Sequence, residues 1–253
     1  MRTVDTRFLK RLKGGDDAAW FELWEVFGPA LERMVEKFAR RCFTPETVRD
    51  VSQETLLRLA REIHRFDPTR GTRFSTWLFQ IAKHVVCGEF TYRNAKKRGE
   101  GVRPGVIDPA YEPEGPAAQP STDYERSVFR AKVYRAMRVA EQRLDFLPFE
   151  VYKARILRGM MSKDIATAMG ISEPTVSRYL KKVRKTVRET IGEVVKEYSF
   201  TAEEEDEVAG ARLNTDDDLF DSSLADIYAT EEESRKGYDT ISRAVQTLGA
   251  RRR

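Results

Sequence analysis

Apolar side chains recur at steps of three and four residues along most of the chain, and this spacing predicts amphipathic α-helices. The clearest pattern lies within residues 16–92, where one predicted helix carries a broad apolar stripe: Trp20, Phe21, Leu23, Trp24, Phe27, Leu31, Met34, Val35 and Phe38. No stretch alternates apolar and polar positions for long enough to predict a strand. The sequence therefore predicts an all-α fold.

Changes in composition divide this all-α chain into four parts. Residues 94–127 concentrate Pro and Gly without periodicity, which is typical of a flexible linker. We therefore expect one helical domain in residues 1–93 and a second in residues 128–198, joined by this linker. Residues 199–253 are rich in acidic side chains and are predicted to form an acidic C-terminal tail.

Residues 161–185 have the pattern of a helix-turn-helix whose second helix is basic. Ser162 is suited to cap the first helix, Gly170 to supply a left-handed turn, and Ser172 to cap the second helix. The outward positions of the second helix carry groups that contact phosphates and base edges in the DNA major groove: Thr175, Ser177, Arg178, Lys181 and Lys182. The alternative is an ordinary surface helix with solvated lysines.

Charge is distributed unevenly along the chain. Residues 128–198 hold sixteen basic and eight acidic side chains, whereas residues 199–253 hold seven basic and fourteen acidic ones. A basic segment with a helix-turn-helix favours DNA as a partner, and the acidic tail has the opposite charge. No apolar run is long enough for a membrane span, and the N-terminal residues lack a signal-peptide core, so we expect a cytoplasmic protein without membrane insertion.

The segment 44–65 predicts a helix with two different faces, beginning with a Thr44 cap and Pro45. One face is apolar and turns inward. The other combines an exposed leucine with polar and acidic side chains: Asp50, Gln53, Glu54 and Leu57. This combination suggests a docking face for a basic protein partner. A solvated charged face is the alternative.

Aromatic and basic residues interleave in and after the segment 65–84, where Asp67, Pro68 and Gly71 predict a loop and Ser75 a helix cap. These side chains are suited to bind an unpaired nucleic-acid strand by stacking and charge: Phe66, Arg70, Arg73, Phe74, Trp77, Lys83, His84, Tyr92 and Arg93. The alternative is that the aromatic residues fill the helical core.

Three segments in this order resemble the extracytoplasmic-function (ECF) sigma factors of bacterial RNA polymerase. DVSQETLLRLA is similar to the family's polymerase-clamp helix, and RFDPTRGTRFSTWLFQIAKH to its −10 loop and following helix. LPFEVYKARILRGMMSKDIATAMGISEPTVSRYLKKVRK is similar to its −35-binding domain. The resemblance covers about residues 16–92 and 128–190, with a linker where the family also has one.

The resemblance implies a role for each of these surfaces. Asp50, Gln53, Glu54 and Leu57 would contact the clamp of the largest subunit of core RNA polymerase. Promoter −10 DNA would be captured by the loop and the helix after it, with Arg70, Arg73, Phe74, Lys83, His84 and Arg93 as the binding residues. Thr175, Ser177, Arg178, Lys181 and Lys182 would read the −35 element. The polymerase is the enzyme, so the resemblance implies no catalytic residue, metal or cofactor in this chain.

The sequence departs from the family beside the clamp helix. Family members usually carry acidic residues ahead of the core of this helix, where this chain has Thr47, Val48 and Arg49. Arg49 should weaken docking on a basic clamp. A phosphate on Thr47 would restore negative charge near the helix N-terminus, so Thr47 and Arg49 are candidate regulatory positions and a kinase or an anti-sigma protein is a candidate partner.

The acidic tail matches nothing common to the family. Apolar residues at helical spacing mark two candidate short helices, one at Phe220, Leu224 and Ile227 and the other at Ile241, Val245 and Leu248. The hypothesis is that the tail docks on the basic second domain or another surface and places its acids where promoter phosphates would bind. A disordered solubilising tail is the alternative.

Two other functions compete with the sigma-factor interpretation. A stand-alone helix-turn-helix repressor or activator would use residues 1–93 to sense a signal. A helical adaptor would bind proteins alone, and the basic charge of residues 128–198 argues against it. An enzyme is the least favoured class, because no nucleophile, metal cluster or glycine-rich phosphate loop is evident.

Overall fold

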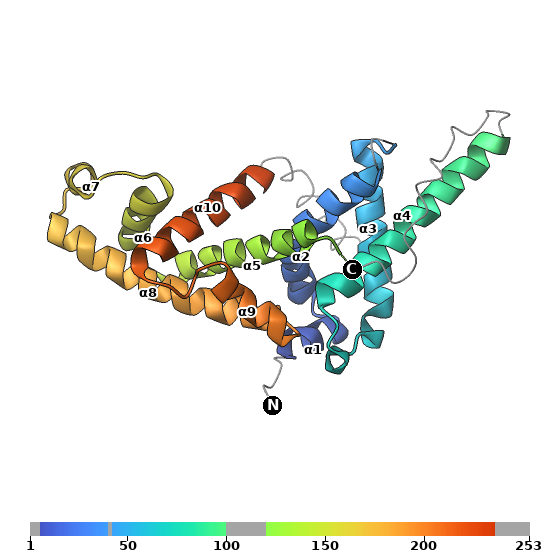
Figure 1. The fold of residues 1–253 in the computed structure, drawn as a ribbon, viewed down its shortest axis with the longest axis horizontal. Helices are drawn as coiled ribbons and strands as arrows, with labels where there is room; N and C mark the ends of the chain where they lie inside the picture. The colour runs from blue at the N-terminus through green and yellow to red at the C-terminus, as the bar shows by residue number, and fades with distance from the viewer. Residues whose placement is uncertain (1–5, 40–41, 100–119, 236–253) are drawn as a thin grey trace.

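The computed structural model describes residues 6–39, 42–99 and 120–235, and these residues form helices and connecting turns without any strand. The predicted all-α fold is confirmed (Figure 1). The α-helices are α1 (Arg7–Lys13), α2 (Asp17–Ala39), α3 (Pro45–Glu62), α4 (Phe74–Gly99), α5 (Thr122–Arg143), α6 (Phe146–Tyr152), α7 (Ser162–Met169), α8 (Glu173–Glu197), α9 (Ala202–Gly210) and α10 (Asp217–Arg235). Three short turns lie between them: η1 (Ile63–Arg65), η2 (Pro68–Arg70) and the π-helical η3 (Lys153–Leu157).

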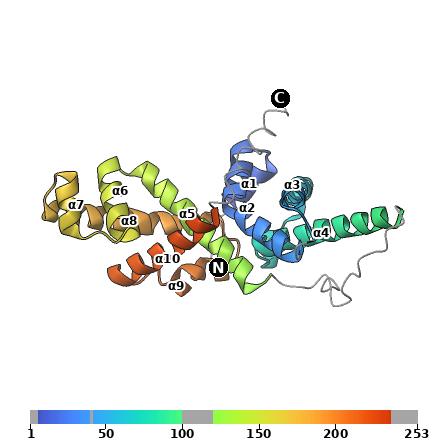
Figure 2. The same ribbon diagram turned by 90° about the horizontal axis from the view of Figure 1, so that it is seen from above.

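Helix α5 occupies the centre of an elongated molecule (Figures 1 and 2). It packs against α2, against the long helix α8 and against α10. Helices α3 and α4 lie toward one end, and α6 and α7 with the start of α8 form the other. The helix that opens the second predicted domain therefore also packs on the first.

The hydrophobic core follows this arrangement. One continuous cluster of buried side chains includes residues of α1 to α6, α8 and the tail, among them Phe27, Phe74, Val133, Val187 and Phe220. A separate small cluster lies under the helix-turn-helix: Val151, Ala154, Ile165, Ala166 and Val176. The helix-turn-helix thus has a core of its own, whereas the remaining helices share one.

Local sequence signals explain some helix boundaries and miss others. Thr44 caps α3 as expected, accepting a hydrogen bond from the backbone of Thr47, and Gly170 has the left-handed φ of 65° that the turn requires. The three serines that were predicted to cap helices do not do so through their side chains. Helix α7 is preceded by Met161, so Ser162 lies inside it, and Ser172 precedes α8 without a side-chain capping bond. Ser75 lies inside α4 and donates a hydrogen bond to Glu125 at 2.7 Å.

Helices extend into both ends of the predicted linker. Helix α4 continues to Gly99 and α5 begins at Thr122, so residues 94–99 and 122–127 of the predicted linker are helical rather than irregular. Ser121 caps α5, and Tyr124 is buried one turn later. The buried face of this helix therefore begins inside the range that was predicted to be linker.

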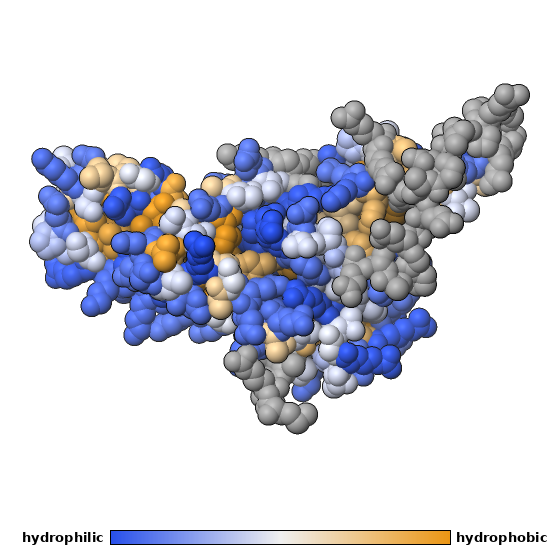
Figure 3. All heavy atoms as spheres, in the orientation of Figure 1, coloured by the Kyte–Doolittle hydropathy of each residue, from blue (hydrophilic) through white to orange (hydrophobic). Residues whose placement is uncertain are grey.

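Within residues 199–235, the tail forms two helices, α9 and α10, that pack on the rest of the chain. The helix predicted at Phe220 and Leu224 is present, and both side chains are fully buried. The second helix, predicted at Ile241, Val245 and Leu248, lies outside the described residues. Hydrophilic side chains cover most of the face seen in Figure 3. None of the helices in the described parts of the chain is both long and apolar enough to cross a lipid bilayer.

Candidate functional site

Helix α3 presents the polar face that the sequence predicted. Asp50 and Glu54 are exposed, Gln53 is half-buried, and Leu57 keeps 38% of its surface exposed. The opposite face packs into the core through Val48, Val51 and Leu59. The structure therefore brings the four expected residues together on one accessible surface, with an apolar side chain among acids.

Of the two regulatory candidates, only Arg49 is exposed. A phosphate acceptor needs an accessible hydroxyl, but Thr47 is 7% exposed. Its hydroxyl lies 2.9 Å from that of Thr44 and accepts a hydrogen bond from Arg93 at 2.6 Å. The spacing gave Thr47 a surface position, and contact with α4 buries it instead.

The loop between α3 and α4 is held by local hydrogen bonds and by an aromatic cluster. Asp67 accepts bonds from the backbone and hydroxyl of Thr69, at 2.9 and 2.6 Å, and Gly71 has a φ of 67°. These bonds lower the pKa of Asp67. Arg70 stays exposed. The loop therefore has a fixed shape, and its exposed Arg70 lies 3.6 Å from the carboxylate of Asp67.

Phe74 does not have the place expected of a base-stacking residue. Its side chain is 0% exposed and packs edge-on against Phe27 and Phe66, and it lies against Trp77 and Phe200. The alternative interpretation, in which aromatic residues fill the core, is correct for Phe74. The sequence pattern could not separate the two because both place aromatic residues at helical spacing.

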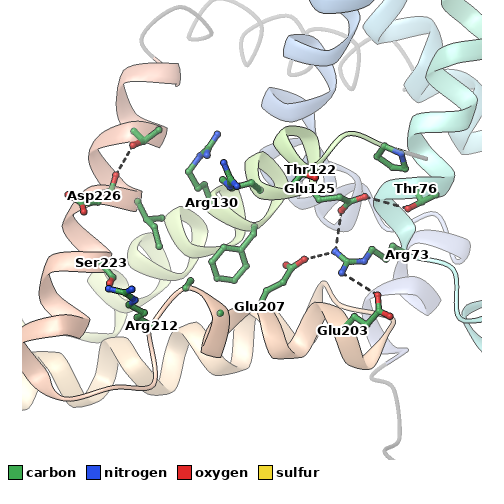
Figure 4. Close-up of a pocket in the computed structure, with 17 residues that line it drawn as sticks. Arg73, Thr76, Thr122, Glu125, Arg130, Glu203, Glu207, Arg212, Ser223 and Asp226 are labelled. Carbon is green, nitrogen blue, oxygen red and sulfur yellow. Dashed lines mark hydrogen bonds and ion pairs between the residues drawn. The ribbon is translucent and has the colours of Figure 1, made fainter. Parts of the chain in front are cut away.

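Arg73, another expected −10 residue, is surrounded by carboxylates (Figure 4). Its guanidinium lies 3.5 Å from Glu125 on α5, and 3.5 and 2.5 Å from Glu203 and Glu207 on α9. Burial alone would lower the pKa of Arg73, but the hydrogen bond to Glu207 and the nearby carboxylates raise it overall. Two acidic residues of the tail therefore form ion pairs with Arg73, which the sequence analysis expected to bind −10 DNA.

The other three −10 residues lie farther along α4. Lys83 is half-buried and His84 is exposed. Arg93 donates to Glu89 at 2.6 Å and to Thr47, and its guanidinium stands 5.1 Å from the ring centre of Phe43. Arg93 therefore braces the start of α3 through its contact with Thr47.

The helix-turn-helix gathers its expected residues on the first half of α8. Ser177, Arg178, Lys181 and Lys182 are exposed, and Thr175 is half-buried. Arg178 donates a hydrogen bond to the Thr175 hydroxyl at 3.0 Å. Lys182 pairs with Asp145 at 3.1 Å. The structure thus forms a compact polar and basic surface at the N-terminal end of α8.

Sequence reasoning missed the residues that connect the tail to these surfaces. Phe200, Glu203 and Glu207 contact the loop region, and Lys132 forms a buried ion pair with Glu204. One signal was readable: Thr201 and Glu204 have the spacing of a capping box, which the structure forms. This spacing predicts where α9 begins, but it does not predict that Glu204 pairs with Lys132.

A cavity of about 870 Å³ lies between α4, α5, α9 and α10, and Arg73, Glu125, Arg130 and Glu207 are among its lining residues (Figure 4). Within the described residues, no three His, Cys, Asp or Glu side chains are grouped so that they could hold a metal ion. The chemistry available at these surfaces is charge pairing, hydrogen bonding and aromatic contact.

Comparison with known proteins finds a match in the part of the chain that holds the first of these surfaces. Residues 30–95 match the family model of Sigma-70 region 2. Among solved structures, the chain is similar to "Structure of CnrH in complex with the cytosolic domain of CnrY", with 19% identity over 73% of this chain and 95% of that chain and a TM-score of 0.31. No curated protein matches the chain. The matched range contains the exposed face of α3 and the loop before α4, so this part of the chain is similar to Sigma-70 region 2.

Proposed function

We propose that the chain is an ECF-type sigma factor that binds core RNA polymerase and directs initiation at specific promoters. The observation that carries this proposal is the match of residues 30–95 to Sigma-70 region 2 together with the exposed face of α3 inside that range. Residues 1–93 would act as region 2, residues 94–127 would contain the linker, and residues 128–198 would act as region 4. The protein would work in the cytoplasm without a cofactor, since the polymerase performs the chemistry.

Core binding would use Asp50, Gln53, Glu54 and Leu57 against the basic clamp of the largest subunit. Acidic side chains on the rim of an interface mainly raise the association rate with a basic partner and fix its orientation. Leu57 at the centre would lose its exposed apolar surface when the two proteins bind. Arg49 stands beside Asp50 and opposes a basic partner, which makes it the better regulatory candidate. A phosphate on Thr47 would first require its contact with Arg93 to open.

A transcription assay with purified core polymerase tests this function. The full chain should produce specific transcripts, Asp50→Lys should weaken core binding about fivefold or more, and Arg49→Glu should strengthen it, because the two changes add opposite charges at one surface. Glu233→Lys, an exposed acid on α10, is the matched charge control. Equal affinities for Asp50→Lys and Glu233→Lys contradict the docking face. Recovery of a compact palindromic operator without polymerase association would instead favour the repressor.

Promoter −35 recognition would use the exposed surface of α8. Thr175, Ser177, Arg178 and Lys181 would approach base edges, while Lys182 would contact phosphate. For the −10 element, Arg70, Lys83 and His84 stay candidates, whereas Phe74 would support the loop from inside. Arg73 could bind a phosphate only after its carboxylate partners leave.

Two alanine variants on α8 should separate base readout from phosphate positioning. Arg178→Ala should cost about 1 to 3 kcal/mol of binding and relax specificity at one base pair, because its guanidinium is held by Thr175 in a fixed direction. Lys182→Ala should weaken binding evenly across sequences and reduce the salt slope by about 1. Binding to a −35 sequence library measures both effects. Equal and sequence-independent losses would show that Arg178 contacts only phosphate.

A further inference from the structure

The segment that leads from α8 into α9 lies directly against the −10 loop region. Phe200 is 1% exposed, and its ring centre is 5.6 Å from that of Phe66 and 5.7 Å from that of Phe74. Phe66 also lies 5.2 Å from Trp77. A side chain from the tail therefore completes an aromatic cluster that otherwise belongs to the loop and the start of α4.

Helix α9 then places two acids at the arginine beside this cluster. Glu203 and Glu207 are one turn apart, and both reach the guanidinium of Arg73 (Figure 4). Glu125 on α5 makes the third ion pair with Arg73. It also accepts hydrogen bonds from Ser75 and Thr76 at the start of α4, so this third carboxylate is not supplied by the tail. The tail thus supplies both an aromatic ring and negative charge at one place.

A buried anchor keeps α9 in this position. Lys132 on α5 donates to Ser199 at 3.1 Å and to Glu204 at 3.3 Å. The second oxygen of Glu204 accepts the backbone bonds of Phe200 and Thr201, at 2.9 and 3.0 Å. One carboxylate therefore caps α9, fixes the backbone of Phe200 and ties both to α5.

Helix α10 also contacts the rest of the chain, at both of its ends. Its Asp217 and Asp221 pair with Arg184 on α8, at 2.7 and 2.6 Å. At its other end, Glu231 lies 3.5 Å from Arg33 on α2. None of these partners is one of the five residues assigned to −35 DNA.

We propose that residues 199–235 form an internal clasp that imitates a bound single strand at the −10 surface. Glu203 and Glu207 take the place of phosphates at Arg73, while the Phe200 ring, edge-on to Phe66 and tilted to Phe74, holds the tail against the loop. Proteins that hold unpaired strands neutralise the phosphates with cations in the same way. The clasp would leave the −35 surface open. The inference rests on the proposed function in one respect, that this loop binds the −10 strand.

The test uses the full-length chain without polymerase and a labelled single-stranded DNA of mixed sequence as the probe. The double variant Glu203→Gln/Glu207→Gln should bind the probe about fivefold more tightly than the unchanged chain, because Arg73 becomes available. Adding Arg73→Ala should remove the gain. The matched control Asp218→Asn/Glu233→Gln removes the same charge from exposed positions of α10 and should leave affinity nearly unchanged.

Hydrogen exchange of the α9 amides provides a second readout that does not depend on DNA. Exchange should increase in Glu203→Gln/Glu207→Gln and not in the control, since the ion pairs hold the helix against Arg73. Equal gains in probe affinity for the two double variants would show that only the net charge of the chain matters, which would overturn the proposed clasp. If α9 exchanges faster but the probe binds no better, the imitation of a strand is wrong. Core binding by α3 remains a separate measurement, so that result leaves the proposed function standing.

Discussion

Replacing Lys132 by Met should destabilise the folded chain by about 3 to 5 kcal/mol, the usual cost of leaving one member of a buried ion pair without its partner. Lys132 and Glu204 are each 1% exposed and stand 3.3 Å apart. Met is close to Lys in size, so the loss comes from the uncompensated carboxylate rather than from a cavity. Chemical denaturation of the full chain, followed by circular dichroism, measures the change.

A second variant distinguishes this electrostatic cost from a packing defect. Lys132→Met/Glu204→Gln removes both charges, and Gln at position 204 still caps the start of α9. The double variant should therefore be more stable than Lys132→Met alone. Lys196→Met, an exposed lysine on α8, is the control and should change stability little. A double variant at least as unstable as the sum of its single changes would mean that the pair contributes no coupling.

The stability of the chain should fall as pH rises from about 5 to 8, because Glu32 is buried without a full set of partners. This residue on α2 is 2% exposed, and its Oε1 has no hydrogen-bond partner. Burial, with a smaller contribution from Glu36, raises the pKa of Glu32 to about 8, and Arg49 and Arg33 oppose the shift. The folded chain therefore keeps a proton that the unfolded chain releases above its ordinary pKa of 4.5. Each proton so retained lowers the free energy of unfolding by about 1.4 kcal/mol per pH unit.

The Glu32→Gln variant isolates this contribution. A glutamine cannot ionise, so urea denaturation at pH 5.5, 7 and 8.5 should give a flatter pH dependence than the unchanged chain. The variant should be the more stable of the two at pH 8.5. Glu233→Gln, at an exposed position, should retain the original slope. Parallel curves for Glu32→Gln and the unchanged chain would rule out a buried proton at this site.

The sequence alone determined the parts of this protein that depend on local geometry. Helical periodicity predicted an all-α chain and the two faces of α3, because side chains three and four positions apart share a face whatever they pack against. Gly170 predicted the left-handed turn of the helix-turn-helix, because glycine adopts that conformation without steric cost. The outward residues of α8 followed from the same spacing. Residues 30–95 also carry enough of the pattern to match the family model of Sigma-70 region 2.

Only the tertiary structure decided which residues meet across the chain. Periodicity predicts a buried or exposed face but not the neighbour, so it could not place Phe74 inside an aromatic cluster or Thr47 against Arg93. Segment charges predicted attraction between the tail and a basic surface. They could not choose Arg73 and Arg184 over Arg178, because charge attraction is long-ranged while ion pairs depend on side-chain distances of a few ångström. The position of α5 against both α2 and α8 likewise depends on packing between distant segments.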